Sequence, residues 1–389
     1  MNEEDRIRPE LHLITGGCGY PGFNLAKKLV GLGHKVRLFD VKEPIWSLPE
    51  NVELVKGDIR NLTEVEAAFE DVDCAYHLAS YGMSGREQLN KKLIEEINIL
   101  GTKNVIKACC KRGVSRLVYT STYNVVFGGQ VIINGDESLP YLPLDQHPDH
   151  YSRTKALAEI EVIKANGSSI KGNGTLRTCA LRLAGVYGPG ELRHLPRIVS
   201  YLEMGMFRFT YGKSTNLVDF LHVDNLVQVH FLAAQALTQE KGYVAAGQAY
   251  FISDNKPVNN FEFFRPLVEG LGYDFPSIKL PMILVYFLAY LTEWLHFFIG
   301  HIYNFQPMLT RTEVYKTGVT HYFSVKKAKR DLGYTPVRQN DMGGIVEYFR
   351  KTGHTRARKR GSDGRQILIS LLLAILCAIA IMAFIPVVV

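Results

Sequence analysis

The sequence has few of the residues that build disulfide-linked or metal-linked folds. It contains six cysteines in 389 residues, and none of them forms a Cys-X-X-Cys pair, so their spacing fits neither a zinc site nor a dense disulfide framework. No metal site is predicted, and free thiols in a reducing compartment are expected. The first residues, MNEED, also lack the basic and apolar regions of a secretory signal. The cysteines are Cys18, Cys74, Cys109, Cys110, Cys179 and Cys377.

Most of the chain also lacks a strong charge of either sign. The formal net charge is +7, but seven Lys and Arg against one acid place +6 of it between Arg350 and Arg365. The nearly neutral remainder lacks the spread basic surface that binding to a phosphate backbone requires, so nucleic acid is not an expected partner. With 47% hydrophobic residues and no short repeat, the chain is expected to fold as two or three domains.

Charge is completely absent from residues 367–389, ILISLLLAILCAIAIMAFIPVVV. A helix of that length spans about 35 Å, enough to cross a hydrocarbon core of about 30 Å. The segment is therefore predicted to be a single-pass C-terminal transmembrane helix, with residues 350–366 as a basic juxtamembrane linker. The positive-inside rule then keeps the catalytic body in the cytosol, and the endoplasmic reticulum is the expected membrane.

A second apolar stretch at residues 280–303 is interrupted too early to be read as a span, because Glu293 ends its charge-free run. Glu293, His296 and Gly300 recur at helical spacing, which predicts a helix with a narrow polar stripe. Two interpretations stay open for this stretch: an ordinary core helix, or an apolar helix at the membrane surface or at the mouth of a lipophilic pocket.

A glycine-rich loop near the N-terminus has the context of a dinucleotide site. Leu11–Thr15 reads as a strand, Phe23–Leu32 as a helix, and the loop GGCGYPG lies between them. Glycines allow a tight turn and close approach of a pyrophosphate to the helix N-terminus. Asp40, which ends the next strand, would bind both ribose hydroxyls and repel a 2′-phosphate, which favours NAD over NADP even though Arg37 and Lys42 are nearby. The alternative is a purely structural glycine turn. The loop positions predicted to contact the cofactor are Gly16, Gly19, Tyr20 and Gly22.

The same alternation of strands and helices continues along the first half of the chain. Apolar runs at residues 52–55, 74–80 and 116–119 read as further strands separated by helices. This pattern predicts an α/β fold with a doubly wound parallel sheet, and a ligand at the carboxyl ends of its strands. Asp58, Ile59 and Ala79 follow strand ends and are further predicted cofactor contacts. For Asp58, capping of the next helix is a competing interpretation.

Tyr151 and Lys155 lie four residues apart and therefore on one side of a helical turn. The spacing alone is weak evidence, because Tyr322 and Lys326 repeat it. Context separates the two pairs. Only Tyr151 follows both the glycine-rich loop and a strand end that carries hydroxyls, at Ser121 and Thr122.

Together, these motifs resemble the extended short-chain dehydrogenase/reductases, and within them the 3β-hydroxysteroid dehydrogenase/isomerase branch. Two departures are Leu183, where many relatives carry Pro, and Thr122, where Ser is commoner; the threonine keeps the hydroxyl. The motifs span residues 11–225, and similarity continues to about residue 350. They are TGGCGYPG at 15–22, Asp40, Gly57-Asp58, Thr120-Ser121-Thr122, Tyr151 to Lys155, LRLAGVYGP at 181–189 and His222-Val223-Asp224.

The resemblance implies NAD as cofactor and a role for each of three catalytic residues. Tyr151 would be the general base in oxidation and the general acid in reduction. A tyrosine with its ordinary pKa of about 10 is a poor base at neutral pH, so Lys155 and the cationic nicotinamide ring would stabilise the phenolate. Lys155 would also bind the nicotinamide ribose. Thr122 would hold the carbinol oxygen, unless its hydroxyl only satisfies the backbone.

The leading hypothesis is an NAD-dependent oxidoreductase for a secondary alcohol on a steroid or sterol, to which the resemblance adds an optional isomerase step. One alternative is a nucleotide-sugar epimerase or dehydratase, in which Arg193, His194 and Arg197 grip a diphosphate. The other is a non-catalytic membrane-tethered NAD-binding sensor. A homodimer is left open.

The expected domain organisation follows from the motifs. An NAD-binding Rossmann domain takes residues 8–185 and is rejoined by about 217–235. A smaller α+β substrate lobe takes 186–216 and 236–349, with helices expected at 261–270 and 324–332. The linker at 350–366 and the transmembrane helix at 367–389 complete the chain.

Overall fold

A seven-stranded sheet forms the centre of the computed structural model, which describes residues 9–83, 85–299 and 311–356. The strand order is β13-β9-β5-β4-β1-β2-β3, and every pairing is parallel. Because the order reverses between β1 and β4, a crevice is expected at the carboxyl ends of these two strands. The strands are β1 Leu11–Thr15, β2 Lys35–Asp40, β3 Val52–Lys56, β4 Cys74–His77, β5 Arg116–Thr122, β9 Arg177–Leu183 and β13 Gln248–Ile252.

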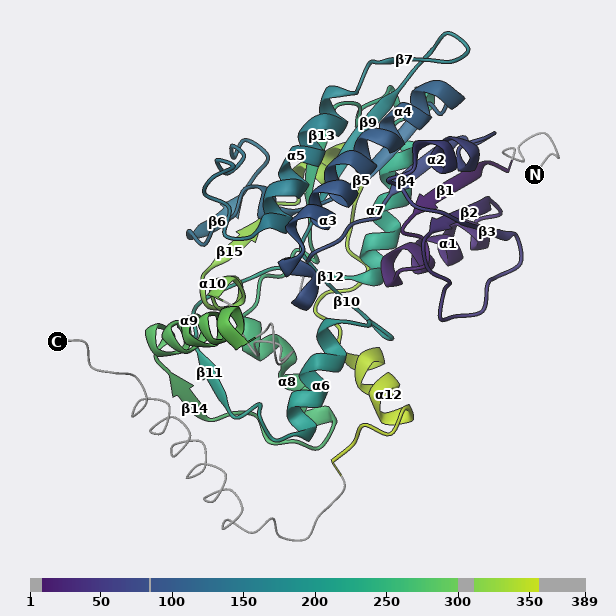
Figure 1. The fold of residues 1–389 in the computed structure, drawn as a ribbon. Coiled ribbons are helices and arrows are strands. Elements are labelled where there is room, and N and C mark those ends of the chain that lie inside the picture. The colour runs from purple at the N-terminus through teal and green to yellow at the C-terminus, as the bar shows by residue number, and fades with distance from the viewer. Residues whose placement is uncertain (1–8, 84, 300–310, 357–389) are drawn as a thin grey trace.

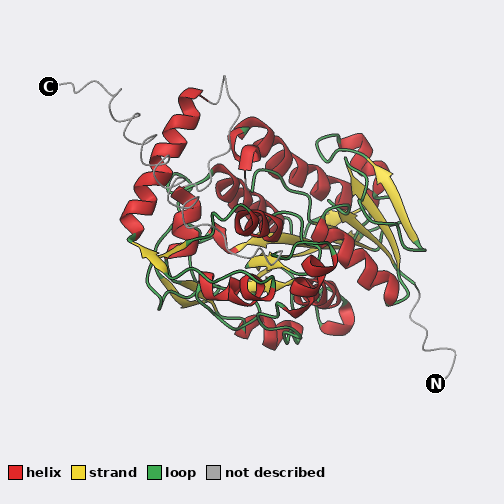
Figure 2. Ribbon diagram, turned by 90° about the horizontal axis from the view of Figure 1, so that it is seen from below, coloured by secondary structure: helices red, strands yellow, loops and turns green. Residues whose placement is uncertain are grey.

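Helices cover both faces of this sheet, as Figure 2 shows. The central strands are apolar on both sides; in β4, for example, all four residues are buried, as a parallel sheet requires. One face packs against α1 Tyr20–Gly31, α7 Val223–Gln235 and α11 Lys326–Leu332. The other packs against α2 Leu62–Ala68, α4 Thr102–Arg112 and α5 His150–Lys164. The predicted doubly wound fold is confirmed.

A smaller lobe of helices and short strand pairs lies at one end of the molecule, around α6, α8 and α12 in Figure 1. Its core joins Leu195, Phe263 and Ile345 from these three helices. The elements are β10 Gly185–Tyr187 paired with β12 Phe220–His222, β11 Phe209–Tyr211 paired with β14 Ile278–Leu280, α6 His194–Glu203, α8 Asn260–Gly270, α9 Met282–Ile299, α10 Arg311–Gly318 and α12 Gly343–Lys351.

Short elements complete the described chain. The strand β6 Ile132–Gly135 pairs with β15 His321–Phe323, and β7 Ser169–Ile170 with β8 Gly174–Thr175. The helical turns are η2 Gly85–Leu89, α3 Lys91–Glu95, the π-helix η3 Glu96–Gly101, η4 Tyr123–Val125 and η5 Gln239–Lys241.

The structure differs from the expected boundary of the substrate lobe. Residues 236–349 were all assigned to that lobe, but β13 is the seventh strand of the main sheet, with Gln248 opposite Cys179. Helix α11 follows it there, because Ala328 and Leu332 pack in the same core as Ile252. The helix expected at 324–332 is thus present, and Gly333 ends it in the left-handed conformation, but it belongs to the nucleotide-binding part. The expected helix at 261–270 does lie in the lobe, as α8.

The predicted transmembrane helix at 367–389 lies outside the described residues, as does most of the predicted linker. Among the residues that are described, including the 18-residue α9, no helix is both long and apolar enough to cross a bilayer.

A buried charge network ties α5 to the sheet. The Glu159 carboxylate on α5 is fully buried and accepts hydrogen bonds from the guanidinium of Arg182 on β9, at 2.9 Å from Nε. It also accepts from the Tyr141 hydroxyl at 2.9 Å and from the hydroxyl of Ser121 on β5. The network fixes α5, and therefore Tyr151 and Lys155 on it, relative to β5 and β9.

Replacing Arg182 by methionine is expected to lower the free energy of unfolding by about 3–5 kcal/mol, because it leaves the Glu159 charge buried without its cation. Urea unfolding measures this. The control is Arg338→Met, because Arg338 is half exposed and pairs with Asp341 at 3.0 Å; there the loss should stay within about 1 kcal/mol. Equal losses of unfolding free energy in the two variants would contradict the structural role of the Arg182–Glu159 pair.

Candidate functional site

The glycine-rich loop leaves no room for a Cβ at several positions, of which Gly16 and Gly22 are two. Gly16 follows β1 with φ +68°, and a Cβ there would lie 2.7 Å from the Cα of Ala79, just beyond β4. A Cβ on Gly22 would lie 2.6 Å from the carbonyl oxygen of Gly16. Gly19 is the N-cap of α1 and offers no side-chain cap, so the first amides of the helix can bind an anion. This geometry fits a dinucleotide pyrophosphate, as predicted.

Asp40 lies beside this loop at the end of β2. Its carboxylate accepts hydrogen bonds from the backbone N–H of Cys18 at 3.0 Å and of Lys42 at 3.1 Å. The guanidinium of Arg37 is occupied elsewhere, by Glu53 at 2.8 Å and by the carbonyls of residues 68 and 70. The acid thus faces the loop while the nearest arginine is committed to other partners. These contacts favour a ribose with free hydroxyls over a 2′-phosphate.

The other predicted cofactor contacts lie at neighbouring strand ends. Asp58 and Ile59 follow β3, and Asp58 pairs with Arg60 at 2.6 Å, which lowers the pKa of its carboxyl. The capping interpretation of Asp58 is wrong, because Asn61 caps α2 by accepting from the N–H of Thr63. Ala79 donates its N–H to the Thr15 hydroxyl at 3.3 Å. All three positions border the carboxyl edge of the sheet.

Tyr151 lies at the same edge, at the start of α5. Asp149 caps this helix by accepting from the N–H of Ser152 at 2.7 Å. The phenol is buried beside Ser80, the residue after Ala79, whose side chain acts to lower the pKa of Tyr151. Since Ala79 touches Gly16, the phenol lies within a few residues of the glycine turn, at the reversal point of the sheet. The structure thus brings the predicted catalytic tyrosine and the predicted cofactor loop together.

Lys155 is also buried, but it contacts the strand rather than the phenol. Its ammonium donates to the carbonyl of Thr120 at 2.5 Å and lies 4.1 Å from the centre of the Tyr119 ring. Burial lowers the pKa of Lys155 to about 7, and the negative charge of Glu159 partly opposes this shift. Burial, with the nearby charge of Asp149, raises the pKa of Tyr151 to about 12. The expected lowering of the phenol pKa by Lys155 is therefore not seen in this arrangement.

The strand-end hydroxyls have separate partners. Thr122 is buried, and its oxygen accepts from the backbone N–H of Asn124 at 3.3 Å, which is the backbone role that the sequence leaves open beside a catalytic one. Ser121 is bound to Glu159 instead. Thr122 as the residue that holds the carbinol oxygen stays a prediction. The second Tyr/Lys pair shares no helix, because Tyr322 lies on β15 and Lys326 begins α11.

Sequence reasoning missed the groups that surround the phenol. Besides Ser80, the charges of Arg193 and Glu87 act on Tyr151, and these two side chains approach each other to 3.6 Å. Glu87 also lines a surface hollow with Tyr81, Leu89 and Asn90.

Arg197, a proposed diphosphate ligand, pairs with Glu313 at 2.8 Å. Burial lowers the pKa of His194. The expected cluster of these basic side chains is therefore partly neutralised.

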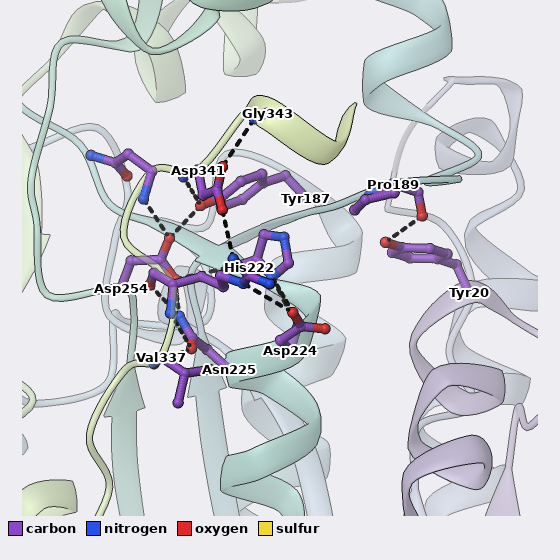
Figure 3. Close-up of polar contacts among 12 residues, drawn as sticks. Tyr20, Tyr187, Pro189, His222, Asp224, Asn225, Asp254, Val337, Asp341 and Gly343 are labelled. Carbon is purple, nitrogen blue, oxygen red and sulfur yellow. Dashed lines mark hydrogen bonds and ion pairs between the residues drawn. The ribbon is translucent and has the colours of Figure 1, made fainter. Parts of the chain in front are cut away.

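Hydrogen bonds of two residues, Tyr20 and Asp254, join the nucleotide-binding part to the lobe (Figure 3). The Tyr20 hydroxyl of the glycine loop donates to the carbonyl of Pro189 at 3.1 Å. The Asp254 carboxylate after β13 accepts from the Tyr187 hydroxyl at 2.6 Å, from the N–H of His222 at 2.8 Å and from the Asn225 amide at 2.7 Å. Burial raises the pKa of Asp254. The only sequence signal for Asp254 is an acid that follows an apolar run, which many loop acids share.

Comparisons with known proteins agree with these features. A model of the 3-beta hydroxysteroid dehydrogenase/isomerase family matches residues 13–282. The chain is 59% identical over 387 residues to short-chain dehydrogenase/reductase family 42E member 1 of Mus musculus, covering 98% of each chain. It is 38% identical over 342 residues to 3beta-hydroxysteroid-dehydrogenase/decarboxylase isoform 1 of Arabidopsis thaliana, covering 84% of this chain and 76% of that one.

Solved structures share the fold. The structure of MoeE5 in complex with UDP-glucose and NAD has a TM-score of 0.63 at 21% identity, over 88% of this chain and 99% of that one. At this identity the likeness establishes the Rossmann architecture.

Replacing Gly22 by alanine is expected to weaken NAD binding at least about tenfold (~1.4 kcal/mol), because the new methyl group collides with the Gly16 carbonyl and displaces the loop. Fluorescence titration with NADH measures the affinity.

Gly31→Ala is the matched control on the same helix, since nothing lies within 4 Å of a Cβ at Gly31. Its affinity should be unchanged, and its melting temperature the same or slightly higher. If Gly22→Ala binds as tightly as Gly31→Ala, the loop does not hold the pyrophosphate.

Proposed function

The chain belongs to the 3-beta hydroxysteroid dehydrogenase/isomerase family, and on that premise we propose that it oxidises or reduces a secondary alcohol on a steroid or sterol with NAD. The observation that carries the proposal is the buried Tyr151 phenol beside Ser80, one residue from the Ala79–Gly16 contact. A proton-transfer group and a dinucleotide cradle thus share one edge of the sheet.

The residues of the cradle fit NAD in charge as well as in shape. The glycine turn and the uncapped start of α1 would hold the pyrophosphate, and Asp40 would hold the adenosine ribose. When bound, NAD supplies the hydride acceptor or donor. The chain's own residues would position the alcohol and move its proton.

Tyr151 is the group that would hold or release this proton. Oxidation needs the phenolate, which accepts the proton of the carbinol; reduction needs the neutral phenol, which donates one. Because burial raises the pKa of Tyr151 to about 12, the neutral phenol predominates at pH 7. Lys155 lies one turn along the helix, and a shift of its ammonium from the Thr120 carbonyl toward the phenol would stabilise the phenolate.

The apolar substrate class is supported by a relative and by an exposed surface. The Arabidopsis relative is named for a 3beta-hydroxysteroid. Helix α9 exposes a row of large apolar side chains, with Ile283 80% and Phe287 54% exposed. Among the two interpretations of this stretch, such exposure favours an apolar helix at a lipid surface or pocket mouth over a core helix.

Membrane attachment is the second part of the proposal. The uncharged segment at 367–389 would cross the bilayer once, and the basic residues before it would keep the body in the cytosol, at the endoplasmic reticulum. A sterol dissolves in the bilayer, so an enzyme attached there meets its substrate where the substrate is concentrated.

Tyr151→Phe is expected to lower kcat for oxidation of 3β-hydroxysteroids by about 10²–10⁴-fold, because the phenylalanine cannot accept the carbinol proton. NADH formation by detergent-solubilised full chain, with a panel of sterols and UDP-sugars, measures the rate. NAD affinity should be unchanged.

Tyr322→Phe is the matched control, because it alters the same residue type in the second Tyr/Lys pair and should leave kcat unchanged. In the parent protein, oxidation should accelerate as the pH rises above 7, because more phenolate forms. A parent that turns over UDP-sugars but no sterol would favour an epimerase or dehydratase, and one that binds NAD with no turnover a sensor. A fully active Tyr151→Phe enzyme would contradict the catalytic role.

Two arginines in the tail, Leu372→Arg with Ile379→Arg, should release the full chain from lipid vesicles, because each charge at the centre of a span costs about 2.5–3.5 kcal/mol. Flotation of vesicles with the protein measures attachment. Leu372→Ala with Ile379→Ala is the matched control and should still float. If the arginine variant floats as well as the alanine variant, the tail is not the anchor.

A further inference from the structure

A cluster of possible metal ligands lies at the amino edge of the sheet, the edge opposite the glycine loop. Glu10 immediately precedes β1, His12 lies within β1, and His34 immediately precedes β2. The parallel pairing of the strands sets Leu11 opposite Lys35, and the N–H of Lys35 donates to the Glu10 carbonyl at 3.0 Å. The fold thus brings His34 close to two residues that precede it by 22 and 24 positions.

The spacing of these three side chains suits one small cation. One ligand atom from each of Glu10, His12 and His34 lies within 4.8 Å of the other two. A tetrahedral ion with bonds of about 2.0–2.1 Å holds its ligand atoms about 3.3 Å apart. His12 Nε2 and Glu10 Oε2 are already 3.2 Å apart. The partly exposed His34, within 4.8 Å of both, would supply the third corner of the tetrahedron.

The same cluster contains buried polar atoms that make no well-aligned hydrogen bond. The His12 side chain is 1% exposed; its Nε2 lies 3.2 Å from Glu10 Oε2 as an ion pair, and its Nδ1 has no hydrogen-bond partner. His34 Nδ1 and the hydroxyl of Tyr76 also lack a hydrogen-bond partner. The Tyr76 ring stacks on His12. Buried polar atoms are normally satisfied by protein, water or an ion. Three atoms without a hydrogen bond in one place, His12 Nδ1, His34 Nδ1 and the Tyr76 hydroxyl, fit a site for a bound water or ion.

We propose that Glu10, His12 and His34 bind a divalent cation of the zinc type. Two imidazoles and one carboxylate are ligands that zinc accepts readily, whereas magnesium and calcium prefer sites made only of oxygen. The partly exposed sides of Glu10 and His34 leave the fourth position to water. The ion would link the start of β1 to the turn before β2.

Two neighbours affect this site. Arg116 donates to the other oxygen of Glu10 at 2.6 Å; it orients the carboxylate, as partners of metal ligands do, although its own charge opposes a cation. The buried thiol of Cys74 lies close to His12. The site is on the far side of the sheet from Tyr151 and does not depend on the proposed catalytic function.

Titration of Zn²⁺ into chelator-treated full chain tests the proposal. We expect one ion per chain with a dissociation constant below about 1 μM, and a higher melting temperature when the ion is bound. Substitution of Co²⁺ should give the visible absorption of a tetrahedral ion. NADH affinity should be the same with and without zinc, because the two sites lie at opposite edges.

His34→Gln should weaken Zn²⁺ binding at least 100-fold. His354→Gln is the matched control, because His354 is also a partly exposed histidine but pairs with Glu203 in the lobe, and its affinity should equal that of the parent. Circular dichroism confirms that both variants are folded. If His34→Gln does not fold, the parent's Co²⁺ spectrum decides. No stoichiometric binding, an octahedral spectrum, or equal weakening in both variants would overturn the site, leaving water as the species that satisfies the cluster.

Discussion

The contact between two backbones, at Gly16 after β1 and Ala79 after β4, is the constraint on which the candidate active site depends. A Cβ at Gly16 would lie 2.7 Å from Ala79, so the close approach requires glycine. It occurs where the strand order reverses. Ser80 comes next in the chain and lies beside the Tyr151 phenol. One steric requirement therefore sets the distance between the cofactor loop and the proton-transfer group.

Burial then determines the charge states at this site. The same removal from water raises the pKa of Tyr151 to about 12 and lowers that of Lys155 to about 7, so burial shifts each side chain toward its neutral form. A positive charge brought near the phenol would reverse this preference for Tyr151. The Glu159 network beneath α5 holds the helix, and Glu159 also favours the ammonium form of Lys155. The scaffold thus sets both the position and the protonation of the pair.

The sequence was sufficient to predict those site residues that belong to a short local motif. The glycine turn, Asp40 and the Tyr151/Lys155 spacing each reflect short-range geometry, and the structure places them together. The sequence was insufficient to predict features that depend on packing between distant segments. The strand β13 has only five residues, so nothing local distinguished it from the strands of the lobe. The orientation of Lys155 toward Thr120 is likewise a choice among buried partners that spacing cannot reveal.

The two parts of the molecule meet through the cofactor loop itself. Tyr20 begins α1 within that loop, and its hydroxyl bonds Pro189 two residues after Tyr187, whose own hydroxyl bonds Asp254 (Figure 3). Asp254 in turn holds the backbone of His222 before α7. A displacement of the glycine loop would therefore be transmitted by direct hydrogen bonds to the start of the lobe. The loop that is suited to hold the dinucleotide is thus also a structural support of the lobe proposed to receive the alcohol.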